Sequence, residues 1–186
     1  GFCRNTALVA FVVAEQSKSR HQPEDQSLIL PHLFNYLREH GEDVQRLDTI
    51  KSSQALTLGS VQGSVVNITT TDGAITQAVV GAISADNLII SGAGAVTLNN
   101  TNSVGILRAS TGGDFSLKNG RALTVGDGTA GVTSTGSVTL QTTSGNLTLA
   151  KAISSGSNVT LATAGNFINN VGATALTTGA GDVWRI

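Results

Sequence analysis

The later part of the chain repeats one short pattern of apolar and polar residues. Gly136 to Asn170 contains three near-copies of a unit in which turn residues precede an apolar–polar–apolar triplet, at Val138–Leu140, Leu147–Leu149 and Val159–Leu161. In a β-strand the two apolar side chains of a triplet point to one face and the threonine between them to the other. So short a fragment cannot bury a face alone. We therefore expect the copies to stack on one another as the rungs of a solenoid.

The same pattern extends back to Ser52. Apolar–x–apolar triplets recur from Leu56 onward, and the segments between them are rich in Gly, Asn, Ser, Thr and Asp, which suit corners. No helix-length amphipathic stretch separates the triplets, which argues against alternating β–α units. At roughly 20 residues per coil, residues 52–186 would form about six or seven coils in a rod on the order of 30 Å long.

A sandwich of antiparallel sheets would also show short strands at this spacing. Two observations favour a parallel β-helix instead. Hairpin-turn sequences are scarce in the periodic part, where Asn119-Gly120 is the candidate, and the units resemble one another as stacked rungs do.

The composition changes sharply near Lys51. Residues 1–51 hold 13 of the 23 charged side chains, all three histidines, both prolines and the single cysteine, but only two of the 22 glycines. The chain is therefore divided into an N-terminal segment, residues 1–51, and solenoid repeats, residues 52–186.

The N-terminal segment opens with an apolar run, Ala7–Ala14, preceded by Arg4. A basic residue followed by 7–15 apolar residues is typical of a secretory signal. Glu15 follows the run where small residues would form a cleavage site, so a buried strand or helix is an equal alternative.

A short helix is predicted over Pro31–His40, because proline suits a first helical turn and Gly41 is a stop signal. Val44, Leu47 and Ile50 continue at a spacing of three, which predicts a second short helical turn. Such a helical piece would cap the open end of a solenoid, and the alternative is an unrelated leader.

Charge and cysteine content exclude several classes of function. The formal net charge is −1, without the basic footprint that nucleic-acid binding usually needs, so we expect no nucleic-acid partner. No apolar run approaches the roughly 20 residues that span a bilayer, so no transmembrane segment is expected. The single cysteine, Cys3, cannot form an intramolecular disulfide, and no Cys/His spacing suits zinc.

The repeats resemble those of a known family. Gly136–Leu149 follow the pattern Gly-x-Val-x-Leu-x-x-x-x-Gly-x-Leu-x-Leu, which recurs in large bacterial exoproteins of the filamentous haemagglutinin type. Gly165–Asn170 and Trp184 are similar to a segment late in the repeat region of such proteins, although there the tryptophan usually follows a basic residue directly. The resemblance covers Ala85–Ile186 well and Ser52–Ser84 weakly.

This resemblance implies a right-handed parallel β-helix, exported by a dedicated outer-membrane transporter partner to the bacterial cell surface or the extracellular medium. It implies roles in adhesion or biofilm formation. We therefore expect a non-catalytic, structural and adhesive segment of a large two-partner-secretion exoprotein, whose repeat surface binds host-cell or matrix surfaces or glycans.

The alternative is a β-helix carbohydrate-active enzyme, either a polysaccharide lyase or a glycosidase. Such an enzyme would cluster carboxylates on one face, with Asp114 and Asp127 as the candidates. The aspartates of the periodic part are isolated and follow no constant step. We therefore predict no enzyme, no catalytic, cofactor-binding or metal-binding residues, and no cofactor.

Four further features receive structural interpretations. Gly112–Asp114 and Gly126–Gly128 resemble pieces of calcium-binding β-roll repeats, but that site needs tandem nonapeptides, so both are interpreted as turns. His21, His32 and His40 are too far apart to be assigned as ligands. The Asn-x-Thr triplets are interpreted as corners followed by outward threonines rather than as glycosylation sites; they start at Asn67, Asn99, Asn146 and Asn158.

Outward threonines are the last of these features. Aligned rows of them would make a flat hydroxyl face, for which ice binding is one hypothesis and ordinary β-propensity the favoured interpretation. The threonines concerned are Thr69, Thr97, Thr139, Thr148 and Thr160.

Overall fold

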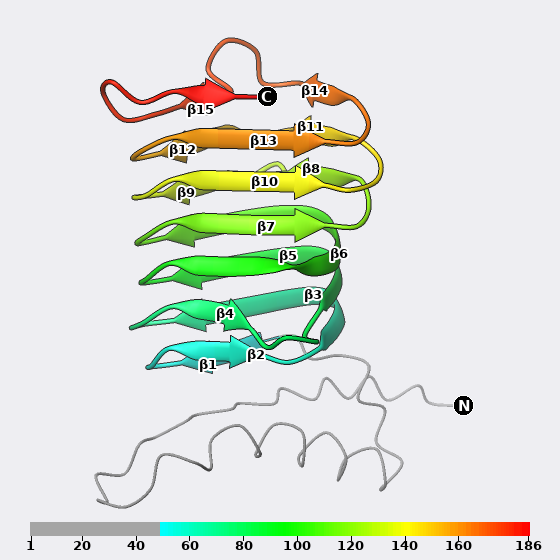
Figure 1. Cartoon of the computed structure of the whole chain (residues 1–186), viewed down its shortest axis with the longest axis vertical. Coiled ribbons are helices and arrows are strands. Elements are labelled where there is room, and N and C mark those ends of the chain that lie inside the picture. Colours follow the sequence, from blue (N-terminus) through cyan, green and yellow to red (C-terminus); the bar gives the residue numbers. More distant parts are fainter. Residues whose placement is uncertain (1–48) are drawn as a thin grey trace, which may run out of the picture.

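The computed structural model describes residues 49–186, which form a parallel β-solenoid of about seven turns (Figure 1). The described part contains strands and connecting corners and no helix. The predicted all-β parallel solenoid is thereby confirmed. The apolar run Ala7–Ala14, the helix predicted over Pro31–His40, and the three histidines lie outside the described residues.

The strands of this part, in chain order, are β1 Thr49–Ser52, β2 Leu56–Leu58, β3 Val61–Thr70, β4 Ile75–Gln77, β5 Ile83–Gly92, β6 Val96–Thr111, β7 Phe115–Asn119, β8 Leu123–Val125, β9 Val132–Ser134, β10 Val138–Thr142, β11 Leu147–Leu149, β12 Ile153–Ser155, β13 Val159–Thr163, β14 Phe167–Asn169, β15 Leu176–Thr177 and β16 Trp184–Arg185.

These strands stack into two walls, and a rung is one wall A strand followed by one wall B strand. Wall B consists of β2, β4, the start of β6, then β7, β10, β13 and β16. Wall A consists of β1, β3, β5 and the rest of β6, followed by three rungs whose strand is broken in two: β8 with β9, β11 with β12, and β14 with β15. Figure 1 shows β7, β10 and β13 stacked at the front of the rod.

The second helical turn, predicted from Val44, Leu47 and Ile50, lies outside the described residues except at its end, and there the structure has a strand in place of a helix. Ile50 lies in β1, where it pairs with Ile68 of β3 and is buried. A spacing of three fits a helix, but Ile50 also stands between the polar residues Thr49 and Lys51, and pairing with β3 buries it. The solenoid therefore already includes Thr49–Ser52.

The core is made of apolar side chains that repeat in columns from rung to rung. In β7 and β10, in the middle of wall B, every second residue is buried. Parallel pairing in register places like residues above one another, so the burial of one rung is continued by the next. Two inward columns of wall B are formed by Phe115, Val138 and Val159, and by Leu117, Leu140 and Leu161.

Buried amides hold the corner where wall B leads into wall A. The side-chain Oδ1 of Asn119 accepts a hydrogen bond from Val104 N at 2.8 Å, and its Nδ2 donates to Val104 O and Arg121 O, each at 2.9 Å. Asn102, one rung earlier, accepts from Ile83 N at 2.8 Å and from Gln77 Nε2 at 2.7 Å. These amides satisfy backbone groups that leave the ladder at the corner, which would otherwise be buried without partners. Asn119-Gly120 therefore forms a solenoid corner and not a hairpin.

Hydroxyl groups and glycines form the opposite corner. Ser134 Oγ donates to Gly113 O and Ser155 Oγ donates to Gly136 O, both at 2.7 Å, so each hydroxyl bonds the corner of the preceding rung. Gly112 lies so close to that stack that an added Cβ would be 2.1 Å from Ala93 O. The corner thus requires glycine because successive rungs approach each other with backbone against backbone.

The buried amide corner gives a stability prediction. Asn119→Ala leaves Val104 N and O without their side-chain partner, so we expect a loss of about 1–3 kcal/mol in the free energy of unfolding. Urea unfolding followed by circular dichroism measures it. The control is Asn99→Ala at an exposed position, expected within about 0.5 kcal/mol of the unchanged chain. Equal unfolding midpoints for the two variants would contradict the role of the buried amide.

Candidate functional site

Each wall carries a column of small hydroxyl side chains on its outer face. On wall B the column is one residue per rung, and we call it the wall B ladder: Thr57, Thr76, Thr97, Ser116, Thr139 and Thr160. Successive members are about 4.8 Å apart, the spacing of paired strands. The Oγ1 atoms of Thr57 and Thr76 are 3.2 Å apart and share a hydrogen bond.

The wall A ladder is equally continuous. Parallel pairing aligns a second set of residues across the six rungs from β3 to β15: Thr69, Ser91, Ser110, Thr133, Ser154 and Thr177. The column survives the break of the wall A strands because β9, β12 and β15 keep the register of β6.

The predicted outward threonines are therefore divided among columns. Thr97, Thr139 and Thr160 share the wall B ladder, whereas Thr69 belongs to wall A and Thr148 stands between Thr124 and Ile168 in a further column. The expectation of aligned rows is confirmed for wall B. The ice-binding hypothesis needs one flat face that carries all five threonines, and they do not share such a face.

The Asn-x-Thr asparagines are also divided. Asn146 Oδ1 accepts from Asn166 N at 2.9 Å and Asn158 Oδ1 accepts from Val183 N at 3.0 Å, so both are corner residues that bond the next rung. The corner interpretation is wrong for Asn67, which lies inside β3 and pairs with Ile89 of β5. Pairing of β3 with β1 on one side and β5 on the other holds Asn67 within the strand.

The structure does not bring the two candidate carboxylates together. Asp114 lies at the corner before β7, where its Oδ1 accepts from Ser137 N at 2.8 Å. Asp127 lies in the loop between β8 and β9, where it pairs with Arg108 of β6. Each carboxylate is thus engaged by its own surroundings, one by a corner backbone and the other by a guanidinium.

The Arg108–Asp127 ion pair is the shorter of two on wall A. Arg108 Nη1 donates to Asp127 Oδ2 at 2.7 Å, and Thr129 donates to Oδ1 from its hydroxyl at 2.6 Å and from its backbone at 3.1 Å. Gly126 and Gly128 flank the aspartate with φ of 92° and 95°, conformations that favour glycine. These hydrogen bonds hold the pKa of Asp127 well below its ordinary value, and the bond from Arg108 has the largest effect.

The glycine–aspartate fragments are accordingly turns, as interpreted from the sequence. Asp127 organises its loop through Thr129, and Asp114 bonds the corner of the next rung. Within residues 49–186 no group of three or more His, Cys, Asp or Glu side chains lies close enough to hold a metal ion.

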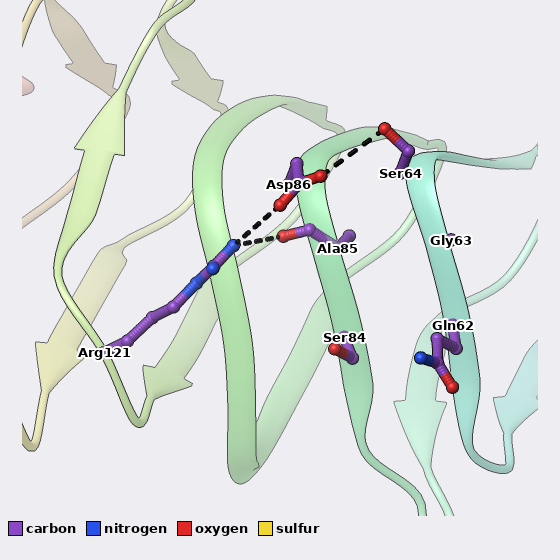
Figure 2. Close-up of a pocket in the computed structure, with 7 residues that line it drawn as sticks. All are labelled: Gln62, Gly63, Ser64, Ser84, Ala85, Asp86 and Arg121. Carbon is purple, nitrogen blue, oxygen red and sulfur yellow. Dashed lines mark hydrogen bonds and ion pairs between the residues drawn. The ribbon is translucent and has the colours of Figure 1, made fainter.

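The second ion pair borders a small pocket on wall A (Figure 2). Arg121 extends from the corner before β8 across Gly105 of β6 to β5, where its Nη2 donates to Ala85 O at 2.7 Å and lies 3.6 Å from Asp86 Oδ1. Ser64 Oγ of β3 donates a long bond of 3.4 Å to Asp86 Oδ2. The pocket has a volume of about 230 Å³ and is lined by Gln62, Gly63, Ser64, Ser84, Ala85, Asp86 and Arg121.

Gly105 allows this arrangement. An added Cβ at that position would be 2.8 Å from Arg121 Nη2 and 2.8 Å from Asp86 O. Any larger residue would therefore displace the guanidinium from the wall. No sequence motif points to this pocket, since Asp86 and Arg121 are far apart in the chain. Once the length of a rung is known, the position that stacks on Asp86 is Gly105 in the next rung, and Arg121 lies near the stacked position in the rung after that.

Comparison with known proteins does not assign the chain to a family. No family model matches the chain, and neither a curated protein nor a solved structure matches it. Among the described residues, no helix is long and apolar enough to cross a membrane.

The Arg108–Asp127 pair gives a prediction about protonation. Replacing Arg108 by Gln removes the main cause of the lowered pKa, so the pKa of Asp127 rises toward its unperturbed value of about 3.9. Carboxyl ¹³C NMR of Asp127, recorded between pH 7 and pH 2, measures the change.

The sign of the stability effect follows from the same shift. The pKa is lower in the folded chain, so the contribution of Asp127 is fully present above about pH 4 and is lost as the pH falls further. The difference in unfolding midpoint between the unchanged chain and Asp127→Asn should shrink in acid. A difference that stays constant down to pH 2 would contradict this account.

Proposed function

We propose that the chain is a structural and adhesive segment of a large secreted bacterial exoprotein, without a catalytic role. The observation that carries the proposal is the outer surface of the solenoid, where each wall presents an unbroken column of hydroxyl groups over six rungs. Hydroxyl groups both donate and accept hydrogen bonds, so a column of them suits many weak contacts with an extended partner surface.

Wall A is the proposed adhesive face. Its ladder runs along the same strands as the Asp86–Arg121 pocket and the Arg108–Asp127 pair, so hydroxyls, a carboxylate, a guanidinium and an amide are presented together. The wall B ladder is bordered by Ala55, Ala74 and Ala95 in its first rungs and by Lys118 and Gln141 in later ones. Wall A differs because it presents two pairs of opposite charges beside its hydroxyls, and such an arrangement gives more specificity than hydroxyls with isolated polar groups.

The proposed partners are host-cell or matrix surfaces or glycans. Weak contacts repeated along a rod add through effective concentration, so the parent protein would attach more strongly than a single rung. The resemblance to haemagglutinin-type repeats supports export by an outer-membrane transporter partner and a location at the bacterial cell surface or outside the cell.

The bonding of the carboxylates weighs against the β-helix enzyme alternative. Glycosidases use two carboxylates about 5–10 Å apart on either side of the bond that is cut. Asp114 accepts a backbone hydrogen bond at a corner, and Asp127 is paired with Arg108 in a different loop. The non-catalytic reading therefore accounts better for how the two groups are bonded.

The proposal is tested by the attachment of the whole chain, labelled with a fluorophore, to cultured epithelial cells and to collagen and fibronectin surfaces. Charge placed on wall A, in the double variant Ser110→Glu and Thr133→Glu, should lower attachment about ten-fold, because carboxylates replace hydroxyls at two successive rungs.

The matched control places the same charge on two successive rungs of wall B, as Thr139→Glu with Thr160→Glu, and should leave attachment within about two-fold. Both pairs are exposed, and thermal unfolding checks that all proteins are folded. Absence of attachment by the unchanged chain on every surface would contradict the adhesive function. Equal loss in both double variants would contradict the choice of wall A.

A further inference from the structure

The Arg121 side chain that borders the pocket is held in place by the backbone around it. The guanidinium is anchored by the bond from Nη2 to Ala85 O at 2.7 Å, and it lies over Gly105, which leaves no side chain in its path. Figure 2 shows the side chain reaching from its own corner to the strand that carries Asp86. A guanidinium fixed in this way loses little conformational freedom when a ligand binds.

Its charged groups keep most of their bonding capacity. Arg121 Nη2 and Asp86 Oδ1 are 3.6 Å apart, longer than the 2.7–2.9 Å of a strong charge-assisted hydrogen bond. The side chains of Arg121 and Asp86 are 42% and 71% exposed. The bond from Ser64 to Asp86 is also long, at 3.4 Å. Asp86 can therefore accept, and Arg121 can donate, further hydrogen bonds.

We infer that this pocket binds one ring of a neutral saccharide. The inference rests on the proposed adhesive function and names the ligand class of wall A. Neighbouring hydroxyls of a sugar donate to the Asp86 carboxylate and accept from the Arg121 guanidinium, while Gln62 and Ser84 can do either. An anionic ligand would be repelled by the carboxylate of Asp86, and a cationic ligand would be repelled by the guanidinium of Arg121.

The size of the pocket agrees with a single ring. Its volume of about 230 Å³ is below the roughly 300–1,000 Å³ of sites that enclose drug-sized ligands. A longer glycan would place one ring in the pocket, and the rest would extend over the outer face of wall A, where β3 and β5 carry Thr69 and Ser91 of the ladder.

The test uses the whole chain and three neutral disaccharides: maltose, mannobiose and N,N′-diacetylchitobiose. Binding is followed by ¹⁵N NMR of the Arg121 Nε–H and Gln62 amide signals. At least one neutral disaccharide should shift both signals, and Asp86→Asn and Gln62→Ala should each weaken it about ten-fold. Digalacturonate, an acidic disaccharide, should bind less well than the neutral one.

Two controls separate a binding role from a structural one. Lys118→Gln removes a cation from β7 of wall B and should leave saccharide binding unchanged. Arg121→Lys keeps the charge but loses the planar fork, and should weaken binding while the unfolding temperature stays within a few degrees.

The outcomes distinguish this inference from the adhesive function. The inference would be overturned, and adhesion left standing, if the chain attaches to cells but binds none of the three neutral saccharides. The same follows if the Asp86→Asn variant binds them as tightly as the unchanged chain does. Preference for digalacturonate would also overturn it. A chain that attaches to no surface yet binds a neutral saccharide in this pocket would overturn adhesion alone.

Discussion

Parallel register between successive rungs is the constraint on which the rest of this structure depends. Side chains alternate across a strand, so a slip of one residue between β10 and β13 would turn Val138 and Leu140 outward and Thr139 inward. The burial of the apolar columns therefore decides the outer surface as well. The alignment of each hydroxyl ladder is a consequence of the core, because each outward residue follows an inward one in every rung.

The corners keep that register by satisfying the backbone where the ladder ends. On one side Asn102 and Asn119 supply amides, and on the other Ser134 and Ser155 supply hydroxyls, each bonding the rung before it. These contacts are local, so corners tolerate loops of different length. The loop at Gly126–Gly131 breaks the wall A strand, yet β9 keeps its pairing with β6. Variation can thus occur at loops and outer positions without disturbing the stack.

Much of the fold could be predicted from the sequence, because the apolar–polar–apolar period directly reports which side chains are buried. Val138 and Leu140, or Val159 and Leu161, lie in the core as their spacing indicates. What failed depends on neighbours that are distant in the chain. Ile50 has a helical spacing with Val44 and Leu47, and only its pairing with Ile68 decides for a strand.

The candidate site was harder to predict than the fold for the same reason. Asp86 and Arg121 are unremarkable singly, and what joins them is Gly105, a residue without a side chain. The ladders were visible only as scattered threonines, since the length of each corner determines which of them share a column. Thr69 and Thr148 show this, because both are outward threonines and each lies outside the wall B ladder.

The central claim, that the rungs are stacked in parallel register, is tested most directly by engineered disulfides in a Cys3→Ser background. Thr139 and Thr160 are register partners, so cysteines at both positions should form a disulfide readily, since paired strands lie about 4.8 Å apart. Cysteines at Thr139 and Ala162 are displaced by two residues, which places their Cα atoms beyond the roughly 7 Å that a disulfide spans. The account predicts rapid oxidation of the first pair and little of the second, while equal oxidation of both, or preference for the second, would contradict the register on which the core, the ladders and the pocket depend.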